Sequence, residues 1–169
     1  DDLIPQFDYI RKSVEAFNLP SIELTNYEAD DLIATYSEQI IKKGENVTVV
    51  SSDKDLMQLY KKNLRIYDPM KNKFINEEDI QKKFGVKAEK VIDVQSLAGD
   101  SSDNVPGVPG IGIKTAAELI NEYGTLENLL SNSKNIKQNK RRETLIENKQ
   151  KAMISKKLVT LKKDVPVKV

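Results

Sequence analysis

The sequence predicts an α/β fold that continues into a helical, basic C-terminal third. A near-continuous run of β-branched residues, 47–51, has the composition of a strand buried in an α/β sheet. Apolar residues recur at helical spacing on both sides of this run, so helices are expected to flank the sheet. Residues 1–109 hold 14 Lys and Arg against 20 Asp and Glu, whereas residues 110–169 hold 13 against 6. This division of charge is typical of a metal site beside a surface that binds a polyanion, and a chance segregation of solvated charges is the alternative.

The composition excludes several classes of protein and of site. With 169 residues, 31% of them charged and 38% hydrophobic, the chain is expected to form one soluble globular domain or a lobe of one. It contains neither an apolar run long enough to span a membrane nor a signal peptide, so no membrane partner is expected. Cysteine and histidine are absent, which excludes disulfides, thiolate sites and the commonest general base. A catalytic metal must therefore be held by carboxylates, which favour Mg²⁺ or Mn²⁺.

The elements of the first part are predicted from the period of their apolar residues. Helical spacing predicts helices over residues 5–17, 25–44, 76–85 and 88–97, and a short helical stretch over 56–59. Short apolar or β-branched runs predict strands over residues 22–24, 47–51, 64–67 and 73–75. Turn and breaker residues separate these elements; Pro20 follows the first helix and Gly44 ends the second.

The C-terminal part is predicted to be mainly helical. A helix over residues 114–123 ends at Gly124, and Thr125 caps a short helix that runs to Leu129. A polar connector over 131–139 leads to two basic helices over 140–148 and 149–161. Residues 165–167 are predicted as a terminal edge strand, where proline is tolerated.

Seven carboxylates stand in three clusters at loop-to-helix junctions or strand ends: Glu28, Asp30, Asp31, Asp53, Asp55, Asp100 and Asp103. Helix capping is the simpler explanation for part of them, since Thr25 and Glu28 fit a capping box and Ser52 or Asp53 can cap the following helix. Further acids at a helix N-terminus add only about 0.3–1 kcal/mol each and repel one another when crowded. In open α/β sheets, ligands bind beyond the carboxyl ends of the strands, where Asp53 and Asp55 are expected.

The segment 99–116 combines two of these acids with a glycine-rich loop. Small residues let a chain approach an anion closely, and loop N–H groups together with a helix N-terminus can bind it. A turn between two helices without any ligand is the alternative. Carboxylates beside a site for a phosphate-sized anion indicate metal ions that act on a phosphodiester.

Three motifs together resemble those of the 5′ nucleases, in particular the 5′-3′ exonuclease domains of bacterial DNA polymerase I. They are Tyr27-Glu28-Ala29-Asp30-Asp31, then Ser52-Asp53-Lys54-Asp55, and then Gly99-Asp100 with Asp103-Asn104, followed by Gly110-Ile111-Gly112 and Lys114-Thr115-Ala116. The resemblance runs over the whole chain. It implies the C-terminal part of a PIN-like nuclease core over residues 1–98, with a partial sheet and flanking helices. It further implies a helical helix-three-turn-helix DNA-binding subdomain over residues 99–169.

The resemblance implies a metal-dependent, structure-specific 5′-3′ exonuclease and flap endonuclease. Its substrate would be DNA with a 5′ flap, nick or gap, including RNA-primed ends, in replication and repair. All seven acids would bind Mg²⁺ or Mn²⁺ ions that activate water and stabilise the leaving oxygen, with Asp31, Asp53 and Asp55 as catalytic residues. The duplex backbone would be gripped by a K⁺-binding loop whose residues are Gly107, Gly110, Ile111, Gly112, Lys114 and Thr115.

One departure from the family pattern concerns the start of the chain. The family's first strands, which carry two further metal-binding aspartates, and its arch would precede residue 1, so a fragment lacking part of the sheet is expected. The resemblance also implies a polymerase after residue 169 and a bacterial cytoplasmic location. A non-catalytic, structure-specific duplex-DNA-binding module is the alternative function. An acidic Ca²⁺-binding structural domain is disfavoured, because no contiguous EF-hand loop is present.

Overall fold

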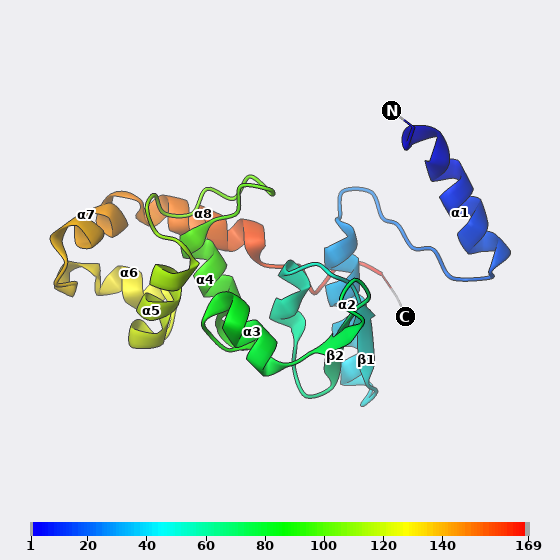
Figure 1. Cartoon of the computed structure of the whole chain (residues 1–169), viewed down its shortest axis with the longest axis horizontal. Coiled ribbons are helices and arrows are strands. Elements are labelled where there is room, and N and C mark those ends of the chain that lie inside the picture. The colour runs from blue at the N-terminus through cyan, green and yellow to red at the C-terminus, as the bar shows by residue number, and fades with distance from the viewer. Residues whose placement is uncertain (1, 168–169) are drawn as a thin grey trace.

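The computed structural model describes residues 2–167 and is elongated (Figure 1). Helix α1 lies at one end, the sheet in the middle, and a group of helices at the other end. The α-helices are α1 (Phe7–Ala16), α2 (Ala29–Lys42), α3 (Glu77–Phe84), α4 (Val91–Ala98), α5 (Ile113–Tyr123), α6 (Leu126–Ser131), α7 (Asn139–Glu147) and α8 (Lys149–Val159). The strands are β1 (Val47–Val50), β2 (Leu64–Asp68) and β3 (Lys73–Ile75). Short 3-10 helices are η1 (Ile4–Gln6), η2 (Asp55–Leu59), η3 (Ala88–Lys90) and η4 (Ser133–Asn135).

The sheet has the strand order β1-β2-β3. β1 and β2 are parallel, with Val47 opposite Leu64 and Val50 opposite Tyr67, so the two strands end at the same edge. β3 joins β2 antiparallel. Among residues 2–167, no strand pairs with the outer edge of β1. The α/β fold with a partial sheet and flanking helices is confirmed.

One apolar core joins the sheet to the helical end of the molecule. It includes Val49 and Ile66 of the sheet, Val94 of α4, Leu119 of α5 and Leu145 of α7. α4 lies centrally and packs against α5 and α8. Because this core is continuous, the placement of α4 relative to the sheet is set by buried apolar contacts. The division of the chain after residue 98 stays a prediction.

Local chemistry accounts for several helix boundaries. α3 begins with a capping box, in which Asn76 accepts from the Asp79 N–H while Asp79 accepts from the Asn76 N–H. Its end is marked by Gly85, whose φ of 72° lies in the left-handed region. The Thr125 hydroxyl accepts from the Asn128 N–H at 3.2 Å, which confirms the predicted cap of α6.

Three local predictions are wrong. Residues 22–24 form no strand; they lie in an irregular, largely exposed connection that pairs with no strand of the described chain. The capping box of Thr25 and Glu28 is absent, because α2 begins at Ala29 and the Glu28 side chain makes no cap hydrogen bond. Residues 165–167 form no strand either. Their backbone bonds to side chains of α2: the Val165 N–H donates to Thr35 Oγ1 at 3.2 Å, and Gln39 Nε2 donates to the Val167 carbonyl at 2.8 Å.

Helix α1 forms as predicted, but it leaves its apolar side in solvent. Phe7 and Ile10 are about half exposed, and the helix stands apart from the body of the molecule (Figure 1). None of the helices within residues 2–167 has the length and apolarity needed to cross a bilayer.

Candidate metal centre and nucleic-acid interface

Three of the predicted acids meet at the edge where β1 and β2 end. Asp55 is the first residue of η2, and Asp100 and Asp103 lie in the turn that follows α4. One carboxylate oxygen from each lies within 4.8 Å of the others. The turn is closed by two backbone hydrogen bonds between Asp100 and Val105, of 2.9 and 2.8 Å, which hold its acids toward Asp55.

The loop after β1 is tied to the end of β2. The Ser52 hydroxyl donates to Asp68 Oδ1 at 2.7 Å, and Asp68 is only 1% exposed. Hydrogen bonds from Lys71 and Ser52 hold the pKa of Asp68 well below its usual range, so this carboxylate stays ionised. Within the loop, the Asp55 N–H donates to Asp53 Oδ1 at 2.9 Å. Asp53 therefore orients the backbone of Asp55.

Lys54 lies inside the carboxylate cluster, a role that the sequence did not predict. Its Nζ is 2.6 Å from Asp100 Oδ2 and 3.7 Å from Asp103 Oδ2. The hydrogen bond from this ammonium lowers the pKa of Asp100. The cluster therefore already accommodates one cation, and its carboxylate oxygens are the hard ligands that Mg²⁺ and Mn²⁺ prefer. The residues present fit a divalent metal ion.

Asp30 belongs electrostatically to this cluster. Partial burial, reinforced by the negative charges of Asp53, Asp55, Glu28 and Asp31, raises its pKa to about 6. Burial likewise raises the pKa of Asp55, against the opposing effects of a hydrogen bond from Gln95 and the charge of Lys54. Carboxylates that resist ionisation together are typical of sites that a cation neutralises.

Asp31 makes a different contact from the one expected. Its Oδ1 accepts from the Lys162 backbone N–H at 2.8 Å, which ties the start of α2 to the chain after α8. Asp31 and Glu28 line a hollow of about 870 Å³ together with Lys157 and Lys162. The structure thus brings Asp55, Asp100 and Asp103 into direct proximity. Glu28 and Asp31 line this separate hollow, and their charges act on Asp30. The catalytic role of Asp31 stays a prediction.

The glycine loop divides into a buried and an exposed part. Gly107 is buried and its N–H donates to Ser155 Oγ at 2.9 Å, and Ile111 is buried with its N–H on the Val108 carbonyl. Gly110, Gly112 and Lys114 are exposed, and Thr115 is half-buried. The exposed part is therefore the portion of the predicted loop that a ligand can reach.

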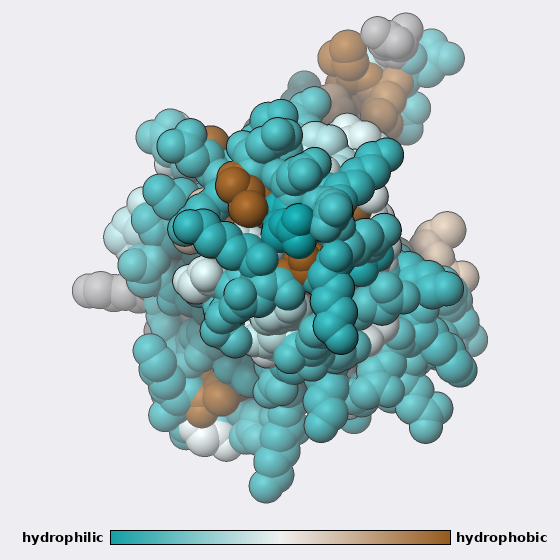
Figure 2. Space-filling view, turned by 90° about the vertical axis from the view of Figure 1, so that its left-hand side faces the viewer, coloured by the Kyte–Doolittle hydropathy of each residue, from teal (hydrophilic) through white to brown (hydrophobic). Residues whose placement is uncertain are grey.

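A small hollow joins this exposed loop to α7. It has a volume of about 220 Å³ and is lined by Gly110, Thr115, Gln138, Lys140 and Arg141, among others. Lys140 and Arg141 were not among the predicted DNA-binding residues, although the basic run at 140–142 was a signal for them. Hydrophilic side chains cover most of this end of the molecule, as Figure 2 shows.

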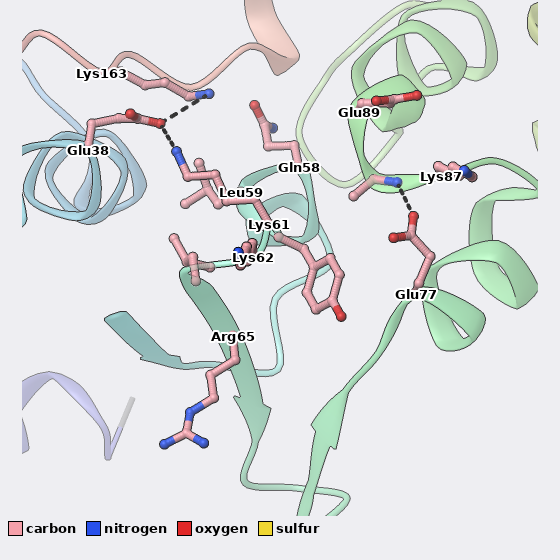
Figure 3. A pocket seen from close by; sticks show the side chains of 13 residues that line it. Glu38, Gln58, Leu59, Lys61, Lys62, Arg65, Glu77, Lys87, Glu89 and Lys163 are labelled. Carbon is pink, nitrogen blue, oxygen red and sulfur yellow. Dashed lines mark hydrogen bonds and ion pairs between the residues drawn. The ribbon is translucent and has the colours of Figure 1, made fainter. Parts of the chain in front are cut away.

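A larger hollow of about 630 Å³ lies near the opposite ends of the strands (Figure 3). This hollow is lined by Leu64, the first residue of β2. The carboxylate cluster lies at the other edge of the sheet, beyond the last residues of β1 and β2. Several of its charges are already neutralised. Glu38 contacts both Lys61 at 2.6 Å and Lys163 at 4.0 Å, as Figure 3 shows. We therefore assign the candidate site to the carboxylate edge.

Family models match both halves of the chain. The model described as the N-terminal resolvase-like domain of 5′-3′ exonuclease matches residues 1–85, and the model described as its C-terminal SAM fold matches residues 86–169. The chain belongs to the 5′-3′ exonuclease family. Its α/β sheet with flanking helices and its helical C-terminal part agree with this membership.

Individual members of the family show the extent of the similarity. The chain is 55% identical over 167 residues to DNA polymerase I of Rhizobium leguminosarum, covering 99% of this chain and 16% of that protein. It is 38% identical over 173 residues to a 5′-3′ exonuclease of Buchnera aphidicola, covering 99% of this chain and 60% of that protein. A bacteriophage T5 flap endonuclease, crystallised with DNA and metal ions, has the same fold. Its TM-score is 0.80 at 23% identity, over 90% of this chain and 57% of that one.

The raised pKa of Asp30 gives this 5′-3′ exonuclease family member a testable pH dependence. Between its ordinary value of 3.8 and the folded value of about 6, the folded state binds more protons than the unfolded state. The free energy of unfolding must therefore fall as the pH rises through that window and stay lower above it. Asp30→Asn removes this penalty. In EDTA we expect it to raise the free energy of unfolding by about 1–2 kcal/mol at pH 7.5, allowing for solvent screening of a partly exposed group.

Urea unfolding at pH 7.5 and pH 4 measures this effect. At pH 4, Asp30 is protonated in the folded state, so the gain from Asp30→Asn should largely disappear. An equal gain at both values of pH would show that the substitution acts through packing rather than through charge.

Proposed function

We propose that this chain is part of a metal-dependent, structure-specific nuclease that cuts DNA at 5′ flaps, nicks or gaps. One observation carries the proposal: the turn that delivers Asp100 and Asp103 to Asp55 continues directly into the exposed glycine loop beside Lys140 and Arg141. One segment thereby joins a carboxylate cluster that could hold a divalent cation to a basic surface. The named relatives, a bacterial DNA polymerase I and a 5′-3′ exonuclease, support the same reading.

In this proposal, one group of residues binds metal ions and another group binds DNA. Asp55, Asp100 and Asp103 would bind Mg²⁺ or Mn²⁺, with Asp30 and Asp53 adding negative charge. When bound, such ions activate a water and stabilise the leaving oxygen of a phosphodiester. Lys114 and the loop N–H groups would contact phosphates, which positions a duplex without reading its sequence. A K⁺ ion bound to the loop carbonyls would add a further positive charge that attracts the DNA phosphates.

The wider setting is proposed from the relatives. The chain spans 16% of the Rhizobium polymerase and 60% of the Buchnera exonuclease. We therefore propose that a polymerase accompanies it in a longer protein. Because these relatives are bacterial, we also propose that this protein acts in the bacterial cytoplasm. RNA-primed 5′ ends would be among its substrates.

A non-catalytic duplex-binding module is the second candidate, and one observation favours it. Lys54 already neutralises Asp100 and Asp103 at 2.6 and 3.7 Å, so the cluster can persist without metal. A pure binding module, however, gains nothing from the further charges of Asp30, Asp53 and Asp55, which raise the cost of folding.

Cleavage of a labelled 5′-flap DNA in Mg²⁺ and in Mn²⁺, with a gel shift in Ca²⁺, separates the two candidates. The chain and a longer protein that contains it are assayed in parallel, in separate reactions. Metal-dependent cutting by either supports the nuclease. Duplex binding without cutting by both supports the binding module, and the absence of binding contradicts both.

Lys114 provides a test of backbone recognition. Its side chain is exposed at the start of α5 beside the loop. We expect Lys114→Ala to weaken duplex binding equally across sequences and to reduce the slope of log affinity against log salt by about 0.9, the loss of one phosphate contact. Fluorescence anisotropy over a range of salt concentrations measures both. Lys42→Ala, at the far end of α2, is the matched control and should leave the slope unchanged.

A sequence-dependent loss in Lys114→Ala would contradict this assignment, because phosphate contacts carry no base information. An unchanged salt slope would place the duplex elsewhere on the molecule.

A further inference from the structure

Gln95 is a buried polar residue that contacts the carboxylate cluster. It lies on α4, is 3% exposed, and its Nε2 donates a hydrogen bond to Asp55 Oδ1. Only the nitrogen of an amide can donate to an ionised carboxylate, so this contact fixes the orientation of the Gln95 side chain. Asp55 is one of the three acids whose oxygens lie within 4.8 Å of one another.

The other end of the same amide has no partner. Gln95 Oε1 is buried and accepts no hydrogen bond from any of residues 2–167. It shares one planar amide with the nitrogen that contacts Asp55, and therefore lies next to the cluster. A buried carbonyl without a donor is costly and calls for an unseen partner such as a bound water.

We propose that Gln95 is a positioning residue of the metal centre. Its amide nitrogen holds Asp55 in the orientation that binds metal, and its carbonyl oxygen accepts a hydrogen bond from a water in the hydration shell of the bound ion. This inference rests on the proposed metal site and adds to it a residue on α4 that binds no metal itself. Partners of this kind orient carboxylate ligands, and their removal typically costs 10–100-fold in metal affinity.

The leucine substitution separates positioning from packing. Gln95→Leu has a similar size, and it removes both the unpaired acceptor and the hydrogen bond to Asp55. Because Asp55 is only half-buried, water can replace the lost donor, so the metal-free protein should be about as stable as the parent. Its affinity for Mn²⁺ should nevertheless fall by about 10–100-fold. Loss of affinity without loss of stability cannot arise from general damage to the fold.

Gln58 offers a matched control with the opposite expectation. It is also a buried glutamine, 8% exposed, but both ends of its amide are used: Nε2 donates to the Val159 carbonyl at 2.9 Å and Oε1 accepts from the Leu161 N–H at 3.1 Å. Gln58→Leu should therefore lower the melting temperature, because two backbone groups lose their partners. Its Mn²⁺ affinity should stay at that of the parent.

The experiment titrates Mn²⁺ into the full chain, follows free Mn²⁺ by electron paramagnetic resonance, and records thermal unfolding in EDTA. The parent, Gln95→Leu, Gln58→Leu and Asp103→Ala are compared. If Gln95→Leu binds Mn²⁺ within twofold of the parental affinity while Asp103→Ala binds it more weakly, the role of Gln95 is overturned and the metal site stands. Failure of the parent to bind Mn²⁺, or equal binding by Asp103→Ala, overturns the metal site and the role of Gln95 with it.

Discussion

In the longer protein that contains this chain, replacing Asp103 by alanine should reduce 5′-flap cleavage by about 10³-fold or more and leave duplex affinity, measured in Ca²⁺, within a few-fold of the parent. Asp103 is one of three carboxylates that lie within 4.8 Å of one another, so its loss removes one of the three side chains proposed to bind the metal directly. Charge stabilisation by a metal is worth several kcal/mol in the transition state, and about 1.4 kcal/mol corresponds to a factor of ten in rate. The side chain is 52% exposed, so its removal should not unfold the protein.

Single-turnover cleavage in Mg²⁺ and gel shifts in Ca²⁺ measure the two quantities. Asp8→Ala, an exposed acid of α1 far from the cluster, is the control and should cleave at the parental rate. Cleavage by Asp103→Ala within tenfold of the parent would show that this cluster is not the metal centre. A parallel loss of DNA affinity would instead point to a role in substrate binding.

Gly107→Ala should be the most destabilising single-methyl change in the loop, at about 2–5 kcal/mol in the free energy of unfolding. Gly107 has a φ of +57°, a left-handed conformation that costs other residues about 1–2 kcal/mol. A Cβ at this position would also lie 2.5 Å from the Gly99 nitrogen and 2.7 Å from the Ala98 carbonyl carbon. These are backbone atoms at the end of α4, so relief requires the loop and the helix to separate, which adds about 1–3 kcal/mol.

Gly110→Ala is the matched control within the same loop. Gly110 also has a positive φ, +75°, but a Cβ there meets no atom of the described chain within 4 Å. Only the backbone cost remains, so we expect a loss of about 1–2 kcal/mol. Equilibrium urea unfolding of the two variants compares them directly. Equal destabilisation would mean that backbone conformation alone, rather than the close approach to α4, requires glycine at residue 107.

Gly110→Ala also reports on DNA. The added methyl group points into open space in the protein. If the variant is still fully folded under the binding conditions, a loss of duplex affinity therefore indicates that DNA approaches this position.

The sequence by itself determined the class of fold and the segments that form the site. The β-branched run at 47–51 predicted β1, and helical spacing predicted α2, α3 and α5, because these periods depend on neighbours in the chain. The acid clusters and the glycine loop were likewise visible as local motifs. The predictions of strands at 22–24 and 165–167 were wrong. A short apolar run becomes a strand only where its backbone pairs with another strand, and the backbone of 165–167 bonds to side chains of α2 instead.

Only the tertiary structure decided which of the acids meet. Asp55 and Gln95 are 40 residues apart, and Asp31 contacts the backbone of Lys162 across 131 residues. No local pattern specifies such pairs, because they follow from the packing of α4 and of the chain after α8 around one core. The same packing buries Gly107 and exposes Gly110, two glycines that the sequence treats alike. The local motifs therefore identified which residue types could carry out the chemistry. Long-range packing determined which of these residues contact one another and which are exposed.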